Sequence, residues 1–320
     1  MPEVDTTVNH ARIIIPVRNG GARWREAAAA LRVAVSDPSV VAVVDSGSGD
    51  GSDRVAAESG FEIARVDPRT FNHGRTRQMA VEQFCAGKEF VVFLTHDAVL
   101  EGRESITELL AAFGDPQVGV AYGRQLPHRQ AGPFEAHMVL FNYGTISETR
   151  SLADASRLGI KAAYTSNSFG AYRLSALSAS GGFPSHLILG EDTSVAVKML
   201  LAGWKVRYCA EARVRHSHAY TIVQEAQRYF DFGVLHTQLP ELMRNFGAAE
   251  GEGARFVSSE LRYMAVHAPH LLPAVLVRNC AKYACYRLGR NFARLPRRLC
   301  RRLSMTKVFW NLEGASSSDG

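Results

Sequence analysis

The chain has 320 residues, 46% hydrophobic and 21% charged, which is enough for a full core and excludes a disordered chain. The formal net charge of +6 indicates anionic partners, but the excess is uneven, since no acidic residue lies between Arg278 and Lys307. The five cysteines lack paired spacing, residues 1–10 lack a signal-peptide pattern, and no stretch has the roughly 18 apolar residues of a membrane span. A cytoplasmic protein is expected, with the inner face of the plasma membrane left open.

The first half of the chain alternates between strand-like and helix-like segments. Short apolar, β-branched runs predict buried strands at residues 13–15, 40–44, 61–66 and 89–94. The alanine-rich residues 23–35 and the residues 74–86 favour helices. This alternation predicts right-handed βαβ units and an α/β, mostly parallel sheet, with the ligand beyond the carboxyl ends of its strands.

Two loops at predicted strand ends carry charged side chains. Residues 45–52 match neither phosphate-binding glycine fingerprint, so they form either a capped turn or a site where Asp45 accepts from a pyrimidine base or a ribose hydroxyl. Arg75 and Arg77 stand in the first turn of a predicted helix, where the helix dipole disfavours cations. They are either a solvated face or the partners of an anion such as a diphosphate.

The strand at residues 89–94 ends abruptly in Thr95, His96 and Asp97. An aspartate after a strand is often a turn residue or a helix cap. At the carboxyl edge of an open parallel sheet it can also hold a metal ion or a substrate hydroxyl. Position alone leaves both roles open for Asp97.

The second half offers two further sets of reactive side chains. Residues 118–123 and 166–173 predict strands, and residues 124–150 between them predict an irregular, functional or mobile insert. Glu191 and Asp192 begin a predicted helix with apolar periodicity. They either complement the helix dipole or supply a general base. His216 and His218 would face the same side of a strand, which favours a metal site modestly over two packed histidines.

The last third predicts helices at residues 224–244, 253–265 and 273–303, with basic and apolar residues interleaved. Such a basic amphipathic tail either lies on an anionic membrane surface or packs on the preceding domain with a solvated basic rim. No nucleic-acid-binding motif accompanies the charge, so nucleic acid is not expected as a partner. Residues 314–320 are expected to be disordered.

A set of short motifs occurs in a fixed order within residues 11–236. They are Pro16-Val17-Arg18-Asn19, Val43-Val44-Asp45-Ser46-Gly47-Ser48, Asn72-His73-Gly74-Arg75-Thr76-Arg77, Phe93-Leu94-Thr95-His96-Asp97-Ala98, Gly190-Glu191-Asp192, Gly203-Trp204-Lys205-Val206, His216-Ser217-His218-Ala219-Tyr220 and Arg228-Tyr229-Phe230-Asp231-Phe232-Gly233. In this order the chain resembles the family 2 inverting glycosyltransferases of the GT-A fold. Within that family it looks most like the bacterial rhamnosyltransferases of surface polysaccharide assembly.

The resemblance implies a role for each matched residue. Asp192 would be the general base, with Glu191 beside it. Asp45 would contact the base of the nucleotide and Arg77 the nucleotide near the metal. The rest of the donor site would comprise Pro16, Arg18, Asn19, Gly74, Thr95 and His96. Residues 124–150 would shape the acceptor pocket.

The resemblance also implies a divalent cation. Asp97 corresponds to the last carboxylate of an Asp-x-Asp element, in which Thr95 and His96 occupy the first and middle positions. A histidine from the later motif would complete the metal shell, with His216 favoured slightly over His218. The expected cofactor is Mg2+ or Mn2+, and an imidazole ligand leans toward Mn2+.

The expected enzyme transfers a deoxyhexose, L-rhamnose from dTDP-L-rhamnose, to a hydroxyl of a glycan or polyprenyl-linked acceptor. Its catalytic domain would span residues 11–220, followed by helices at 221–313 that contact a membrane surface or form an oligomer. Another nucleotide-sugar donor and a non-catalytic carbohydrate-binding role stay open. A nucleotidyltransferase would need a glycine-rich loop with a Lys/Arg signature after the first strand, which residues 16–21 lack.

Overall fold

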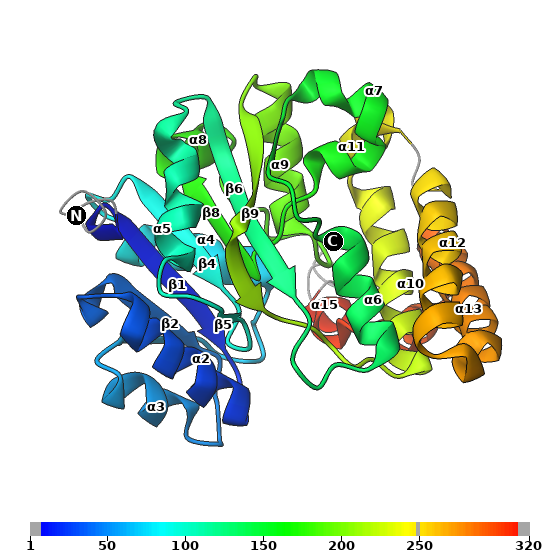
Figure 1. The fold of residues 1–320 in the computed structure, drawn as a ribbon, viewed down its shortest axis with the longest axis horizontal. Coiled ribbons are helices and arrows are strands. Elements are labelled where there is room, and N and C mark those ends of the chain that lie inside the picture. The colour runs from blue at the N-terminus through cyan, green and yellow to red at the C-terminus, as the bar shows by residue number, and fades with distance from the viewer. Residues whose placement is uncertain (1–7, 248–249, 313–320) are drawn as a thin grey trace, which may run out of the picture.

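The computed structural model describes residues 8–247 and 250–312. Its centre is a nine-stranded sheet with the order β3-β2-β1-β4-β8-β6-β9-β5, in which β7 also pairs with β9 (Figure 1). The strands are β1 (Ala11–Val17), β2 (Val41–Asp45), β3 (Glu62–Arg65), β4 (Phe90–Leu94), β5 (Val99–Leu100), β6 (Val118–Leu126), β7 (Glu148–Arg150), β8 (Phe169–Arg173) and β9 (Lys205–Arg215). All four strands predicted in the first half of the chain are present.

The sheet is mixed, with a parallel half at its amino-terminal side. Strands β3, β2, β1 and β4 run parallel to one another, and β6 runs parallel to β9. Strand β8 lies antiparallel between β4 and β6, and the short strands β5 and β7 are antiparallel to β9. The predicted α/β class is therefore confirmed.

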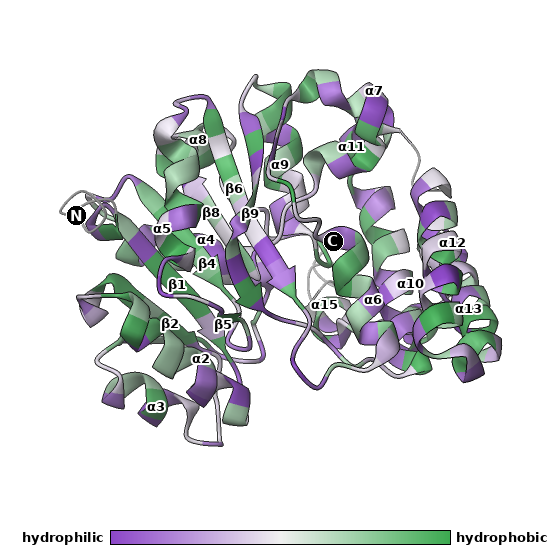
Figure 2. Cartoon of the chain, viewed as in Figure 1, coloured by the Kyte–Doolittle hydropathy of each residue, from purple (hydrophilic) through white to green (hydrophobic). Residues whose placement is uncertain are grey.

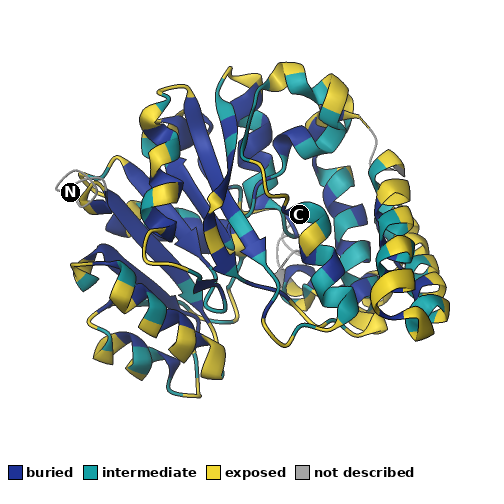
Figure 3. Ribbon diagram, viewed as in Figure 1, coloured by how far each residue is buried: buried dark blue, intermediate teal, exposed yellow. Residues whose placement is uncertain are grey.

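Helices cover both faces of the sheet. Those before the last third are α2 (Gly21–Ala34), α3 (Ser52–Glu58), α4 (His73–Phe84), α5 (Ser105–Leu110), α6 (Pro133–Asn142), α7 (Ala155–Leu158), α8 (Leu174–Ala179) and α9 (Glu191–Leu201). Because side chains alternate along a strand, Ile13 and Ile15 pack with Trp24 of α2, whereas Ile14 packs with Phe84 of α4 on the other face. Strands β1 and β2 are accordingly mostly apolar in Figure 2 and buried in Figure 3.

The prediction of an irregular insert at residues 124–150 is wrong, because this segment completes β6 and forms α6 and β7. Helix α6 packs against helices far along the chain: the rings of Phe141 and Phe256 lie 5.1 Å apart, and Phe134 packs on Met264 and Val275. A helix that depends on such remote partners leaves little periodic signal of its own.

The last third forms α10 (Ile222–Gln238), α11 (Pro240–Phe246), α12 (Glu250–His267), α13 (Leu272–Arg290), α14 (Arg297–Leu303) and α15 (Lys307–Leu312). Two helices that were predicted as continuous are divided. Pro240 begins α11, whereas α13 ends at Arg290 and α14 begins only after Pro296. The expected tail at residues 314–320 lies outside the described residues. Within the described ranges no helix has the length and apolar character needed to cross a membrane.

Helix α13 packs closely on α10 (Figure 1). A Cβ atom on Gly289 would lie 2.0 Å from the Phe230 carbonyl oxygen, and one on Gly233 would lie 2.3 Å from that of Tyr286. Phe230 also belongs to the same apolar cluster as Phe93 of β4. The carboxyl-terminal helices therefore pack on the sheet domain, as one of the two sequence interpretations expected.

Candidate active site

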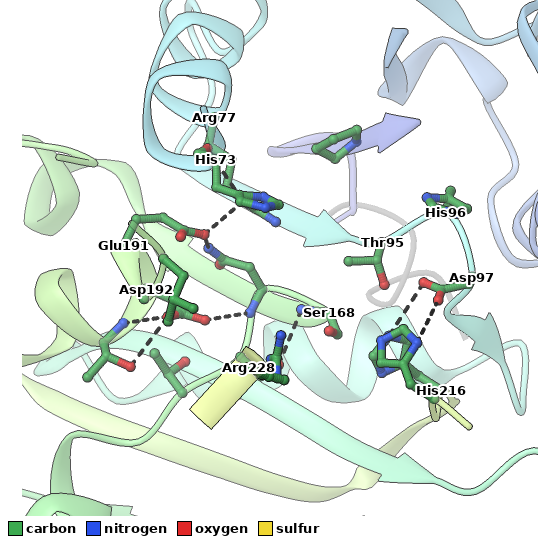
Figure 4. Close-up of a pocket in the computed structure, with 18 of the residues that line it drawn as sticks. His73, Arg77, Thr95, His96, Asp97, Ser168, Glu191, Asp192, His216 and Arg228 are labelled. Carbon is green, nitrogen blue, oxygen red and sulfur yellow. Dashed lines mark hydrogen bonds and ion pairs between the residues drawn. The ribbon is translucent and has the colours of Figure 1, made fainter. Parts of the chain in front are cut away.

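A cavity of about 510 Å³ opens at the carboxyl ends of β1 and β4, beside the end of β9. Its walls come from residues 16–18, 95–97, 164–168 and 189–193, from the two histidines after β9, and from α10. Figure 4 shows two groups of polar side chains in it, with Asp97 and His216 on one side and Glu191 and Asp192 on the other. This is the edge of the sheet that the sequence predicted.

Asp97 meets both predicted histidines. Its two carboxylate oxygens lie 3.4 Å from His216 Nε2 and 3.7 Å from His218 Nδ1. Both histidines follow β9 instead of lying on it, yet the loop brings their rings together, with centroids 4.6 Å apart. Burial alone would raise the pKa of Asp97, but the hydrogen bond and charge of His216 outweigh it and hold the pKa well below its usual value.

These three side chains fit a divalent metal ion. One ligand atom from each lies within 4.8 Å of the others, close enough to surround a single ion. Partial burial and the neighbouring His216 lower the pKa of His218, which favours the neutral imidazole that binds metal. Beside them, the hydroxyl of Thr95 is buried without a hydrogen-bond partner among the described residues, as expected of a group that serves a bound ligand.

On the other side of the cavity, Glu191 and Asp192 begin α9 after Gly190, whose φ of 76° is left-handed. Glu191 is buried and accepts from Arg77 Nη1 at 2.7 Å and from Asn167 Nδ2 at 3.1 Å. Asp192 accepts from the backbone N–H groups of Thr193 at 2.7 Å and Asn167 at 3.3 Å. Asn167 thus donates to both carboxylates, through its side chain to Glu191 and through its backbone to Asp192.

Their electrostatic environments differ. Burial and the charge of Glu191 raise the pKa of Asp192 to about 6. Burial would also raise the pKa of Glu191, but Arg77 and then His73 outweigh it and lower that pKa. Two neighbouring carboxyl groups whose pKa values are driven apart are typical of acid–base catalysis. Asp192 has the pKa of a general base that works near neutral pH.

The donor-site residues expected near the first strands lie in or beside the cavity. Pro16 and Arg18 line it after β1. Asn19, with a left-handed φ of 49°, joins the two neighbouring loops: its Oδ1 accepts from Gly49 N–H at 2.9 Å. Asp45 is buried at the end of β2 and accepts from Ser48 N–H at 3.2 Å, so its carboxylate organises its own turn next to the cavity.

Some of the remaining expected donor residues line the cavity, and one packs against a neighbouring loop instead. Thr95, His96 and Arg77 line the cavity, and the anion that Arg77 meets is Glu191 of the chain itself. Gly74 is not among the lining residues. Its backbone lies against Pro184, whose carbonyl oxygen would be 1.8 Å from an added Cβ. Gly74 therefore allows α4 to approach the loop before α9.

Sequence reasoning assigned no role to several lining residues. Arg228 enters from α10, with its guanidinium 5.9 Å from the Tyr220 ring and 5.2 Å from the Phe232 ring. Asn167 holds both acidic residues of α9. The polar run Ser166-Asn167-Ser168 ahead of a buried strand was the available signal for Asn167. Arg228 stood in a matched motif with no assigned chemistry.

Comparison with known proteins identifies the family. Residues 90–230 match the model of the glycosyl transferase family group 2. The O-antigen chain rhamnosyltransferases WbaN of Salmonella anatum and RfbN of Salmonella typhimurium are 45% and 44% identical to this chain over 307 residues, 96% of its length and 97% and 98% of theirs. The chain belongs to the family 2 glycosyltransferases. Membership of this family favours a glycosyltransferase over the non-catalytic carbohydrate-binding role that stayed open on sequence alone.

Solved structures support the GT-A fold of this glycosyltransferase. The mannosyltransferase PcManGT from Pyrobaculum calidifontis, in complex with GDP-Man and Mn2+, matches with a TM-score of 0.56 at 17% identity, over 97% of this chain and 88% of that one. S. aureus TarS 1–349 matches with a TM-score of 0.51 at 16% identity, over 89% and 91%. The predicted GT-A fold is confirmed.

Proposed function

We propose that this glycosyltransferase transfers L-rhamnose from dTDP-L-rhamnose, with inversion, to a hydroxyl of a growing cell-surface glycan. The observation that carries the proposal is the similarity to two O-antigen chain rhamnosyltransferases over nearly the whole length of all three chains. The cavity supports it, because a base candidate and a metal-ligand cluster lie on its two sides.

In the proposed reaction, the acceptor hydroxyl attacks the anomeric carbon of the sugar as its proton passes to Asp192. A new carbon–oxygen bond forms on one face of the sugar while the bond to the diphosphate breaks on the other, and dTDP leaves. With a pKa of about 6, Asp192 is ionised at neutral pH and still basic enough to take the proton. Glu191 stays ionised beside Arg77, and its negative charge maintains the basicity of Asp192.

On the donor side, Asp97, His216 and His218 would hold Mn2+ or Mg2+. When bound, such an ion neutralises charge on the departing diphosphate. Thr95 would offer its hydroxyl to the same region, and Arg228 adds a positive charge from α10. Pro16, Arg18 and the loop organised by Asp45 would hold the nucleotide.

A lipid-linked acceptor fits the carboxyl-terminal helices. The solvent-facing side of α13 exposes Leu276, Val277 and Tyr283 to 60%, 58% and 59%. An exposed basic run follows, comprising Arg294, Arg297, Arg298, Arg301 and Arg302. Exposed apolar side chains and clustered arginines in the same carboxyl-terminal helices suit an anionic membrane surface, so we include such a surface among the proposed partners.

Vesicle sedimentation tests the membrane partner. Arg298→Ala with Arg301→Ala, and separately Leu276→Glu, should each reduce binding to vesicles rich in anionic lipid. The control Arg32→Ala with Arg54→Ala removes two exposed arginines from α2 and α3 and should bind normally. Equal binding by all variants would reject this surface. A dimer measured by light scattering and disrupted by Leu276→Glu would instead assign the apolar face to a second copy of the chain.

A calorimetric screen tests the donor. We expect dTDP-L-rhamnose to bind in the presence of Mn2+ more tightly than UDP- or GDP-linked sugars. Tighter binding of another nucleotide sugar would replace the proposed donor. Binding of a free glycan with no affinity for any nucleotide sugar or metal would point to a carbohydrate-binding protein.

A further inference from the structure

Gln125 joins the two sides of the cavity through its side-chain amide. It lies on β6 and is buried, with 5% of its surface exposed. Its Oε1 lies 2.8 Å from His216 Nδ1, and its Nε2 donates to Ser166 Oγ at 3.0 Å. Gln125 therefore contacts a proposed metal ligand on one side and the loop 165–168 on the other.

The first contact fixes the tautomer of His216. An imidazole binds a metal through one nitrogen when its other nitrogen carries the proton and has an acceptor for it. With the amide nitrogen of Gln125 engaged by Ser166, its oxygen faces His216 and accepts from Nδ1–H. Nε2 of His216, the atom that faces Asp97, is then the nitrogen that can exchange its proton for a metal ion.

The backbone of His216 is fixed to the same strand. Its N–H donates to the carbonyl oxygen of Leu126 at 3.0 Å, which extends the pairing of β6 with β9 past the end of the strand. Ring and backbone are both held to β6, so the position of His216 follows that of the sheet.

His218 lacks this support. Its ring packs against those of His216 and Tyr220, with centroids 4.6 Å and 5.1 Å away, and its side chain is 40% exposed. Within the described ranges its ring makes no hydrogen bond, only the 3.7 Å approach to Asp97. The two histidines of the cluster are thus unequally prepared to bind a metal.

The second contact of Gln125 leads to the base. Ser166 Oγ also accepts from Ser168 N–H at 3.3 Å, which shapes the turn around Asn167. From that turn, Asn167 donates its backbone N–H to Asp192 and its side-chain amide to Glu191. A continuous path of hydrogen bonds and one turn of backbone therefore runs from the metal cluster to the base.

We propose that Gln125 is a positioning residue of the metal site, which holds His216 in the tautomer and orientation that bind the ion. His216 is then the dominant imidazole ligand and His218 the weaker one. Through Ser166, the same amide keeps the metal cluster in register with the loop that holds Asp192. This inference rests on the metal-dependent transfer proposed above.

Binding of Mn2+ tests the role without any measurement of transfer. Free Mn2+ is quantified by electron paramagnetic resonance, with and without dTDP, for the unsubstituted protein and for Gln125→Leu, Gln125→Glu, His216→Ala and His218→Ala. We expect Gln125→Leu to weaken Mn2+ binding by roughly ten- to a hundred-fold. Gln125→Glu retains an acceptor for Nδ1–H and should bind Mn2+ at least as well as the unsubstituted protein. Thermal unfolding checks that each variant folds. If Gln125→Leu does not fold, the affinity of Gln125→Glu for Mn2+ tests the role of Gln125.

Double substitutions identify which histidine depends on Gln125. Gln125→Leu should cause no further loss of affinity when His216 is already alanine, because its effect acts through that ring. Combined with His218→Ala, the two losses should multiply. Affinity of Gln125→Leu equal to that of the unsubstituted protein, weak binding by a folded Gln125→Glu, or the reverse pattern of coupling would overturn the role of Gln125. No Mn2+ binding by the unsubstituted protein, with or without dTDP, would reject the proposed metal site itself.

Discussion

Arg77→Met removes one charge of a buried ion pair at the base of the cavity. Arg77 Nη1 lies 2.7 Å from Glu191 Oε1, and the two side chains are only 5% and 8% exposed. Breaking a buried pair by removing one partner costs about 3–5 kcal/mol, because the other charge stays behind unpaired. Asn167 still donates to Glu191 in the variant, so we expect a loss near the lower end, about 3 kcal/mol in the free energy of unfolding at pH 7.5.

The loss should depend on pH in a defined direction. In the unsubstituted protein Arg77 and His73 lower the pKa of Glu191 despite its burial, so the stabilisation is full above the ordinary pKa and is lost as pH falls through the lowered one. Without Arg77, burial raises the pKa of Glu191, and stability is instead lost as pH rises through that value. The difference between the two proteins should therefore be largest near neutrality and shrink toward pH 5.

Equilibrium unfolding in urea at pH 5 and pH 7.5 measures this difference. Arg75→Met is the matched control, since Arg75 is exposed two residues away on the same helix and its loss should change stability by about 0.5 kcal/mol or less. Adding Glu191→Gln to Arg77→Met removes the unpaired charge and should restore much of the stability at pH 7.5. Equal stability of the two methionine variants, or no recovery in the double variant, would refute the buried-pair argument.

The remaining predictions concern catalysis, metal binding and helix packing. The value of kcat/KM should rise with pH and level off above about 6, as Asp192 loses its proton. Any activity that remains in Asp192→Asn should lack this rise. A pH-independent rate in the unsubstituted protein would exclude Asp192 as the base. Asp97→Ala should weaken Mn2+ binding at least roughly tenfold in a titration of the folded variant, and unaltered affinity would remove Asp97 from the ligand set. Gly289→Ala should destabilise the protein by about 1–3 kcal/mol, because the new Cβ would meet the Phe230 carbonyl oxygen. The control Gly253→Ala, in open space on α12, should instead stabilise it by about 0.5–1 kcal/mol in the same thermal melt, and similar effects at both glycines would count against a close helix crossing.

The sequence predicted those parts of the fold that leave a local pattern. The β-branched run of β1 and the apolar run of β4 located two central strands because strands buried on both faces need such residues. The direction of β8 left no such pattern, since an antiparallel strand between two buried neighbours has the same composition as a parallel one. The breaks at Pro240 and Pro296 were visible in the sequence, but helical periodicity on both sides hid them.

Within the site, the sequence pointed to single residues more readily than to their partners. Asp97 stood out because it follows a predicted strand, and His216 and His218 stood out because of their spacing of two residues; the structure brings all three together. The pairing of Arg77 with Glu191 spans 114 residues and has no local signature. Gln125 likewise lies within a strand whose alternation says nothing of an imidazole that arrives 91 residues later.

The most direct test of the account is the stereochemistry and base dependence of a single reaction. The purified protein is incubated with Mn2+, dTDP-L-rhamnose and a cell-surface glycan acceptor, and nuclear magnetic resonance follows both dTDP and the anomeric configuration of the new linkage. Inverting transfer with Asp192 as the base predicts equal amounts of dTDP and of a product whose configuration is opposite to that of the donor, and loss of both with Asp192→Asn. Retention of configuration, or unchanged turnover by Asp192→Asn, would contradict it.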